Sequence, residues 1–463
     1  MDAKELFFTR KTGFEQADAQ AVQAYAEGYK EFLDEGKTER DAVAYMTDRA
    51  VKFGFRPFVR GMAVQPGDRL YQINRGKGII LAVIGEEALD QGVNLTAAHM
   101  DAPRVDIRTV PLYEQDGMAF FKTHYYGGIK KYQWMAIPLE LRGVVCVCRD
   151  GEVKKVPVRI GDKPGDPRFV ITDLLPHLAA DQMKKPVAEA FKGEGLNILV
   201  ASTPSETETE AGDVSDKIKL GVLEFLNRAY GMTETDFLSA ELTCVPAWGA
   251  CDIGFDRSMV GAYGHDDRVC CYPAATALME LTETPRRTCV CLLVDKEETG
   301  SDGVTGMKSR HFDTFMGDLC RAQGVGLDAC FEHSVCLSAD VCNAFDPNFA
   351  EVSEARNDSR INCGLVITKY TGARGKSGTS DASAELMARV RNIMDGADVR
   401  WQTGQLGRVD QGGGGTVAMY LANRNIDTVD AGVPVLSMHA PFEVIAKLDL
   451  YMAFRGFGAF YRA

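Results

Sequence analysis

Two adjacent glutamates, Glu297 and Glu298, stand just after an apolar run at residues 288–294 and just before a turn that contains Gly300. A short, unbroken apolar run is typical of a strand that is buried on both faces. Polar residues that follow such a strand lie at the mouth of an open α/β sheet, where ligands usually bind. The two carboxylates would repel each other there unless cations lay beside them. One glutamate could therefore bind a divalent cation while the other carries a proton.

Three other apolar segments also end in residues that commonly bind metals. Residues 93–98 lead into His99, and two later segments end at Asp340 and at His439. Asp101 follows His99 by two positions, so in an extended chain both side chains point to the same side. A carboxylate in that place could hold the imidazole in the orientation that metal binding requires.

A further carboxylate, Asp266, stands near the start of a helix-like segment at residues 270–281. It could cap that helix or face a metal. Because the strand ends of a doubly wound sheet converge at one edge, we expect five ligand-type residues to meet there. These residues are His99, Asp266, one of the pair Glu297 and Glu298, Asp340 and His439. Imidazole and carboxylate ligands together suit two zinc ions, or else cobalt or manganese.

Each of these residues has an ordinary structural explanation when it is considered alone. Adjacent glutamates can form a solvated turn, a histidine at a strand end can be satisfied locally, and an acid near a helix start can cap it. His265, His311 and His333 lack such a setting, so we expect them to be structural or exposed. The metal-site prediction therefore depends on the shared arrangement and not on any one residue.

The elements around these residues predict an α/β protein with a doubly wound, mixed sheet. Residues 14–33 and 39–53 have the apolar spacing of helices, and residues 55–64 and 68–83 have strand-like patterns. Between about 105 and 241 the chain alternates strand-like pieces with turns, and regions of α/β character lie on both sides. We therefore expect an α/β domain at 1–104 plus 242–463, with an inserted, mainly β domain at 105–241.

Composition excludes several classes of function. The chain has 463 residues, a formal net charge of −13 and no basic stripe, which argues against nucleic-acid and anionic-membrane partners. Its first residues lack the features of a signal peptide, and no apolar run is long enough to span a bilayer. The thirteen cysteines include no Cys-x-x-Cys pair and several lie in apolar runs. We expect buried free thiols and a cytoplasmic protein.

The chain resembles the aspartyl aminopeptidase family of dinuclear zinc exopeptidases over nearly its whole length. The matching motifs are Ala98-His-Met-Asp101, His265-Asp-Asp-Arg268, Asp295-Lys-Glu-Glu-Thr-Gly-Ser301, Leu337-Ser-Ala-Asp340 with Asp346-Pro-Asn348, and Ser437-Met-His439. The segments 369–382 and 410–416 look closest to the bacterial branch. One departure is that the animal and yeast enzymes have leucine where this chain has His265.

This resemblance implies roles for the candidate residues. Terminal metal ligands would be His99, Glu298, Asp340 and His439, with Asp266 bridging the two metals. Glu297 would be the general base and Asp101 would support His99. The family also implies an interface domain and homododecamers built from dimers, in which His177 would reach into a neighbouring active site. From the sequence alone, His177 could equally cap its own short helix.

Substrate preference is less defined. The resemblance implies that Lys369 recognises acidic side chains, with help from Arg374 and Lys376, although all three could be solvated loop charges. The nearby Asp381 argues against an acidic preference, and some bacterial relatives favour lysine or a broader range of residues. Gly413 lies in a glycine run, Gly412–Gly415, that is better explained as backbone close to substrate than as a phosphate loop.

The sequence therefore predicts a metal-dependent aminopeptidase that removes the N-terminal residue of peptides with a metal-activated water and Glu297 as base. An acidic preference, a lysine preference and broad specificity all remain open. Two alternatives also stay open: a dinuclear deacylase with the same fold, and a catalytically silent scaffold that retains the fold.

Overall fold

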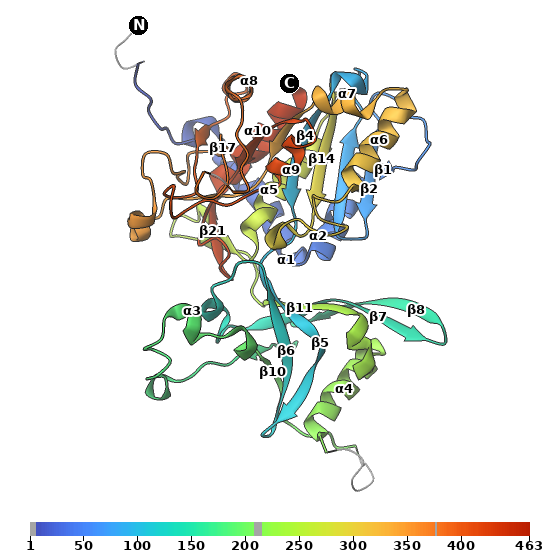
Figure 1. Cartoon of the computed structure of the whole chain (residues 1–463), viewed down its shortest axis with the longest axis vertical. Coiled ribbons are helices and arrows are strands. Elements are labelled where there is room, and N and C mark those ends of the chain that lie inside the picture. Colours follow the sequence, from blue (N-terminus) through green and yellow to red (C-terminus); the bar gives the residue numbers. More distant parts are fainter. Residues whose placement is uncertain (1–5, 208–214, 376) are drawn as a thin grey trace. The chain divides into compact units, whose positions relative to one another are not determined.

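The computed structural model describes residues 6–207, 215–375 and 377–463. Contacts divide the chain into two compact units (Figure 1). The first unit contains the residues up to Asp101 together with Gly249–Met438 and Phe442–Ala463. The second unit contains Ala102–Trp248 and His439–Pro441.

The first unit is built on a mixed sheet that has nine strands within the described residues, in the order β1-β2-β3-β14-β4-β15-β19-β17-β18. The strands are β1 (Arg56–Pro57), β2 (Arg69–Asn74), β3 (Gly78–Val83), β4 (Val93–His99), β14 (Thr288–Val294), β15 (Val335–Ser338), β17 (Leu365–Thr368), β18 (Trp401–Thr403) and β19 (Asp427–Gly432). β4 lies between β14 and β15 and is parallel to both. β3 is antiparallel to β14, which makes the sheet mixed. The predicted α/β class is confirmed.

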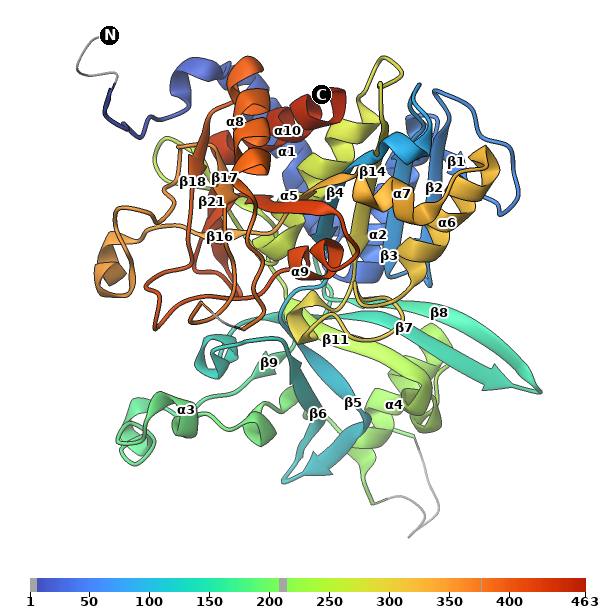
Figure 2. The same cartoon turned by 45° about the horizontal axis from the view of Figure 1, so that its top comes forward.

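Helices cover both faces of this sheet (Figure 2). They are α1 (Ala19–Glu35), α2 (Glu39–Lys52), α5 (His265–Met279), α6 (His311–Gln323), α7 (Leu327–Glu332), α8 (Ala384–Gly396), α9 (Ala418–Ala422) and α10 (Lys447–Arg462). Every side chain of β3, β4 and β14 is buried. Alternate residues of these strands enter two cores: one with α1, α2, α5, α8 and α10, and one with α6, α7 and α9. A strand covered on both faces needs the unbroken apolar runs seen in the sequence.

A smaller sheet of five strands completes the first unit within its described residues. It consists of β12 (Cys251–Ile253), β13 (Met259–Ala262), β16 (Cys342–Asn343), β20 (Pro434–Leu436) and β21 (Glu443–Ala446). The strand that precedes His439 is therefore part of this second sheet. The expectation that all four strand ends belong to one sheet edge was wrong for that strand, because its apolar pattern carries no information about which sheet it joins.

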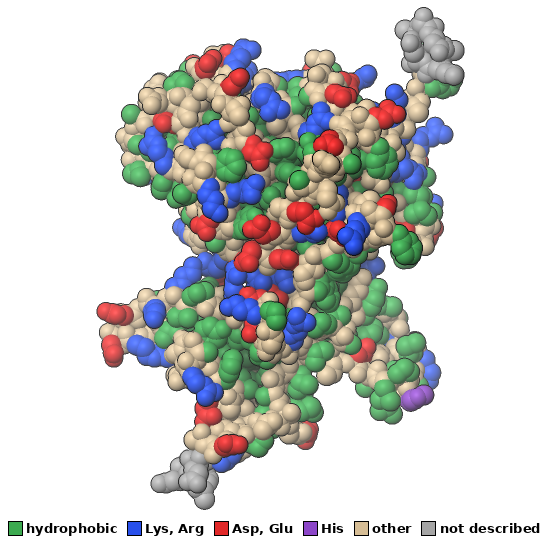
Figure 3. Space-filling view, turned by 180° about the vertical axis from the view of Figure 1, so that it is seen from behind, with side chains coloured by type: hydrophobic (Ala, Val, Ile, Leu, Met, Phe, Trp, Pro, Cys, Tyr) green, Lys and Arg blue, Asp and Glu red, His purple; other side chains and the backbone are tan. Residues whose placement is uncertain are grey.

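The second unit has an antiparallel sheet with seven strands in the described residues, in the order β8-β7-β11-β5-β6-β10-β9. The strands are β5 (Arg104–Gln115), β6 (Met118–Tyr126), β7 (Leu139–Arg149), β8 (Glu152–Ile160), β9 (Val170–Ile171), β10 (Ile198–Ala201) and β11 (Ala240–Pro246), accompanied by α3 (Val187–Ala190) and α4 (Lys217–Tyr230). Hydrophobic side chains are visible on the surface of this unit (Figure 3). Leu174, Leu175, Leu178, Met183 and Val187 are all at least half exposed.

Several expected boundaries differ from the structure. The expected helix at 14–33 is divided: Phe14–Gln16 form a 3-10 turn, Ala17 and Asp18 are extended, and α1 begins at Ala19, where the Asp18 side chain caps it by accepting the Gln20 amide. The predicted strand at 55–64 shrinks to the two residues of β1, since proline and glycine interrupt it. All thirteen cysteines are free, but Cys148 and Cys251 are exposed, contrary to the expectation of burial. Among the described residues, no helix has the length and apolar character needed to cross a membrane.

Candidate active site

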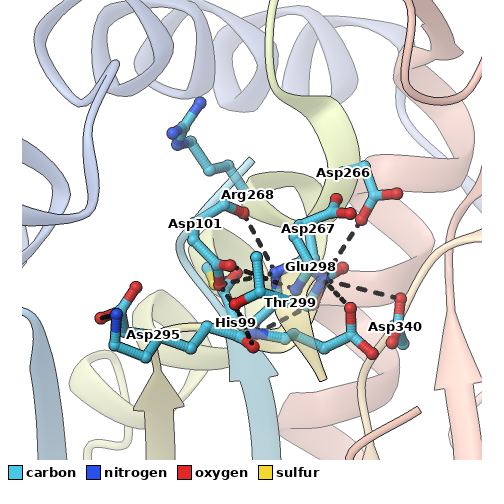
Figure 4. Close-up of polar contacts among 12 residues, drawn as sticks. His99, Asp101, Asp266, Asp267, Arg268, Asp295, Glu298, Thr299 and Asp340 are labelled. Atoms are coloured by element: carbon cyan, nitrogen blue, oxygen red, sulfur yellow. Dashed lines mark hydrogen bonds and ion pairs between the residues drawn. The ribbon is translucent and has the colours of Figure 1, made fainter. Parts of the chain in front are cut away.

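Three strand ends place the central side chains. In the nine-stranded sheet, Val294 of β14 is paired with His99 at the end of β4, and Ser338 of β15 is paired with Ala97. Glu297, Glu298 and Asp340 come just after the two flanking strands and therefore lie beside His99. Figure 4 shows His99, Glu298 and Asp340 gathered in this way, with Asp266 and Asp267 opposite them.

His99 is the centre of this cluster. Its side chain is almost fully buried, and its Nε2 lies 3.2 Å from Oδ1 of Asp266. The same nitrogen lies 3.8 Å from Oε2 of Glu297 and 4.0 Å from Oδ1 of Asp340. One imidazole nitrogen thus faces three carboxylates that come from distant parts of the sequence.

Two overlapping sets of side chains could hold a metal ion. His99, Asp266 and Glu298 form one set, and His99, Asp267 and Asp340 form the other, with one ligand atom of each residue within 4.8 Å of the rest. Oδ1 of Asp267 is buried and makes no hydrogen bond among the residues the structure describes. Nitrogen and carboxylate oxygen are the ligands that zinc accepts, so the donor set fits a zinc centre.

Asp267 is the residue that the sequence analysis missed. Its neighbour Asp266 was chosen alone, although the Asp-Asp pair itself was visible in the sequence. Asp266 and Asp267 both have non-helical backbone angles at the start of α5. Because the chain is not helical there, the two side chains do not follow helical spacing and both can enter the cluster.

Electrostatics show that the carboxylates crowd one another. Burial raises the pKa of Asp267 well above its ordinary value, and the adjacent Asp266 raises it further. The pKa of Asp340 is raised by the same two causes, burial and neighbouring carboxylates. For His99, burial lowers the pKa, but contacts with Asp101 and Asp266 outweigh it and the pKa is raised. Protons would be displaced from such a cluster when cations bind.

Asp101 contacts His99 at Nδ1, the ring nitrogen that does not face the other carboxylates. It is fully buried, and its Oδ1 lies 3.3 Å from Nδ1 of His99. Its two oxygens also accept the backbone amides of Glu297 at 3.1 Å and Glu298 at 3.2 Å. The backbone carbonyl oxygen of Asp101 also lies 3.1 Å from Nδ1, so this one residue orients the imidazole and fixes the turn that carries both glutamates.

Glu297 differs from Glu298 in its surroundings. It belongs to neither set of potential ligands found among the described residues, whereas Glu298 does. Its side chain is 19% exposed and its carboxylate remains within 4 Å of His99. The preceding Lys296 adopts a left-handed conformation with φ of 69°, which reverses the chain direction after β14. The position of Glu297 thus suits a proton carrier beside the cluster.

The two candidate residues in the second unit are placed separately. His439 is grouped with that unit, where its Nδ1 lies 2.9 Å from the carbonyl oxygen of Gly128. His177 lies in a short 3-10 helix, Pro176–Leu178, and is exposed. Among the described residues, no side chain of the N-cap position, Leu175, caps that turn. Their roles as metal ligand and as active-site residue of a neighbour stay predictions.

The proposed substrate-binding residues lie on loops of the first unit. Lys369 forms an ion pair with Asp381 at 2.5 Å, and both side chains are at least 40% exposed. Arg374 is exposed, and Lys376 lies outside the described residues. Gly413 has φ of 104°, and a Cβ there would lie 2.3 Å from the carbonyl oxygen of Gly372. Glycine is needed at this position because two backbone segments touch.

The remaining histidines are not part of the cluster. His265 is fully buried, and burial lowers its pKa to about 3, so its ring is neutral. His333 is held by the carbonyl oxygen of Asp90, 2.7 Å from its Nδ1. His311 begins α6 and is half-buried. The prediction that these residues are structural or exposed is confirmed, with His265 on the buried side.

Comparisons with known proteins show which family the chain resembles. The family model described as aminopeptidase I zinc metalloprotease (M18) matches residues 32–461. A probable M18 family aminopeptidase 1 of Clostridium acetobutylicum is 44% identical, covering 96% of each chain, and one of Thermotoga maritima is 41% identical, covering 96% of this chain and 98% of that protein. The crystal structure of the M18 aminopeptidase of Thermotoga maritima superposes with a TM-score of 0.93 at 39% identity, covering 99% of this chain and 100% of that one. The S. cerevisiae mApe1 dodecamer shares the fold at 21% identity, with a TM-score of 0.77, and covers 96% of this chain and 97% of that one.

Proposed function

The chain belongs to the M18 aminopeptidase family of zinc metalloproteases, and from this premise we propose that it uses two divalent cations held around His99. The observation that supports the proposal is the pair of overlapping ligand sets that share His99. Glu298 and Asp340 belong to different sets and would each hold one cation, and Asp266 would serve both cations, as the family resemblance implies. His439 would complete the set, as the family resemblance implies. Zinc is the favoured metal, with cobalt or manganese as substitutes.

Bound cations would supply a water of lowered pKa and a positive charge for the tetrahedral oxyanion. Glu297 would accept the proton of the attacking water and return it to the leaving amine. Its carboxylate is close enough to His99 for this role and is not needed as a ligand. Asp101 would keep both His99 and the Glu297 amide in place throughout.

Cleavage at the N-terminal residue requires recognition of a free α-amine. The cluster is rich in carboxylates, and a carboxylate can bind an ammonium group. For the side chain of that residue, Lys369 would favour acids only where its charge is not neutralised by Asp381. The preference for acidic, basic or broad substrates therefore depends on this ion pair.

We also propose that the chain forms a homo-oligomer through its second unit. The segment from Leu174 to Val187 exposes five large apolar side chains, more than a monomer needs on its surface. One structure with the same fold is described as a dodecamer. His177 lies within this segment and would be carried toward a neighbouring subunit. A cytoplasmic location remains our expectation for a chain of free cysteines.

A substrate panel with metal analysis tests the proposal. Purified protein is loaded with zinc, its ions per chain are counted, and aminoacyl-anilides are compared with N-acetylated amino acids. We expect two ions per chain and hydrolysis only of substrates with a free α-amine. Hydrolysis of the acetylated compounds alone would favour a deacylase. Fewer than two ions with no hydrolysis would favour a scaffold that retains the fold.

A further inference from the structure

The N-terminal helix α1 contacts the first residue of α5 through the side chains of Tyr29 and His265. Tyr29 of α1 and His265 of α5 are both fully buried, and the Tyr29 hydroxyl lies 2.8 Å from Nδ1 of His265. Their rings are stacked with centroids 5.7 Å apart. The other ring nitrogen, Nε2, lies 3.1 Å from the carbonyl oxygen of Val260 on β13. His265 is thus held between a helix and a strand.

These two contacts define how the ring is hydrogen-bonded. A carbonyl oxygen can only accept, so Nε2 carries the hydrogen and donates it to Val260. The Tyr29 hydroxyl is then the hydrogen-bond partner of the other ring nitrogen, Nδ1, at 2.8 Å. Both ring nitrogens are satisfied in a site that excludes water, so the ring has one favoured orientation.

His265 directly precedes Asp266, whose carboxylate lies 3.2 Å from Nε2 of His99. The backbone at Asp266 and Asp267 is not helical, so helical hydrogen bonds do not fix it. The Asp266 amide, in the peptide that joins Asp266 to His265, donates to Oε2 of Glu443 at 3.2 Å, and Glu443 is almost fully buried. The chain that leads into Asp266 is therefore held by two contacts, one from Glu443 to its backbone and one from the His265 ring.

We propose that Tyr29 is a positioning residue of the metal centre, which acts through His265 to hold the backbone that presents Asp266 to the cations. This inference rests on the proposed function, because it takes Asp266 as a metal ligand. The family model matches the chain only from residue 32, so Tyr29 lies outside the matched stretch. If Tyr29 has this role, a residue of the N-terminal helix α1 contributes to the metal centre without touching the metal.

The test compares Tyr29→Phe with Tyr461→Phe. Tyr461 is an equally buried tyrosine whose hydroxyl lies 2.5 Å from Thr96 Oγ1 and donates to the carbonyl oxygen of Ala274 at 3.1 Å, so its loss costs two core hydrogen bonds away from His265. We measure zinc affinity of the metal-free full chain by competition with a chelator, and the melting temperature alongside. Tyr29→Phe should weaken zinc binding about tenfold, as loss of groups that orient metal ligands does. Tyr461→Phe should lower the melting temperature without changing zinc affinity.

A second variant tests whether Tyr29 acts through His265. His265→Leu should weaken zinc binding by itself, and Tyr29→Phe should add nothing in that background, because the two residues form one unit. Unchanged zinc affinity in Tyr29→Phe, an equal loss in Tyr461→Phe, or additive losses in the double variant would each overturn the inference. Asp266→Asn separates a failure of the proposed metal centre from a failure of the role of Tyr29. If Asp266→Asn leaves zinc binding intact, the proposed metal centre has failed. If it weakens binding while Tyr29→Phe does not, only the role of Tyr29 has failed.

Discussion

Oδ1 of Asp101 lies 3.3 Å from Nδ1 of His99, on the side of the imidazole opposite to the nitrogen that faces the carboxylate cluster. The two residues are only two positions apart, yet Asp101 also binds the backbone of the Glu297 turn from another strand. Asp101 therefore connects the ends of β4 and β14. It contacts both His99, the proposed metal ligand, and the turn that carries Glu297, the proposed proton carrier.

Replacing Asp101 by alanine should damage metal binding more than replacing it by asparagine. Alanine removes the carboxylate beside Nδ1 of His99, which keeps only the backbone carbonyl oxygen of residue 101 at 3.1 Å, and it frees both amides of the glutamate turn. We expect zinc affinity to fall about 10- to 100-fold in Asp101→Ala, the usual range for such supporting carboxylates. Asp101→Asn keeps an oxygen for the amides and should lose less. Equal losses in the two variants would contradict this explanation, and chelator competition measures both.

Asp267 should contribute to the cluster although the sequence did not single it out. Its Oδ1 is buried and has no hydrogen-bond partner among the described residues, while Oδ2 accepts the His99 amide at 3.3 Å. In Asp267→Asn the amide oxygen can replace only one of these two acceptors. We therefore expect fewer than two tightly bound zinc ions per chain after dialysis. Two ions retained as in the wild type would show that Asp267 only positions His99.

Stability should depend on pH through Asp430, a buried residue of β19. Burial raises its pKa to about 7, although hydroxyls of Thr416 and Ser338 donate to it and oppose the shift. A raised folded-state pKa means that the protonated acid stabilises the fold below the unfolded pKa near 4, and that this stability is lost as pH rises toward 7. Asp430→Asn removes this loss. The melting temperature of the variant should therefore rise relative to the wild type between pH 4 and pH 7, and a constant difference would disprove the assignment.

The Lys369–Asp381 pair should tune substrate preference. Both partners are substantially exposed and 2.5 Å apart, so Asp381 neutralises the lysine. Asp381→Ala would free the lysine charge and remove a negative charge that repels acidic substrates. We expect the ratio of kcat/KM for Asp- over Leu-anilide to rise about two- to fivefold, since exposed pairs are worth less than about 1 kcal/mol. Asp381→Asn is the matched control of similar size, and an unchanged ratio in both variants would exclude Lys369 from the pocket.

The sequence revealed the parts of the site that depend on strands buried on both faces. β14 has the same bounds as the apolar run at 288–294. β4 covers the apolar run at 93–98 and one further residue, His99. Such strands have strong apolar patterns, and the carboxyl ends of parallel strands lie at the same edge of the sheet. The residues that follow them could therefore be assigned to a common site. His99, Glu298 and Asp340 were identified in this way.

What the sequence could not show depends on contacts between distant segments. The non-helical start of α5 brings Asp267 into the cluster, and no periodicity signals it. The pairing of Tyr29 with His265 joins residues 236 positions apart, so neither pattern nor spacing could suggest it. Likewise, β20 belongs to the five-stranded sheet because it pairs with β16 and β21. Its own residues do not indicate which sheet it joins.

The central claim is that Glu297 moves the proton while its neighbours hold the metals. The most direct measurement is kcat of Glu297→Gln on an aminoacyl-anilide at saturating zinc, with the bound ions counted in the same sample. The glutamine is of the same size and cannot accept the proton, so we expect two ions per chain and a kcat about 10²- to 10⁴-fold lower. A kcat close to that of the wild type with both ions bound would contradict the account.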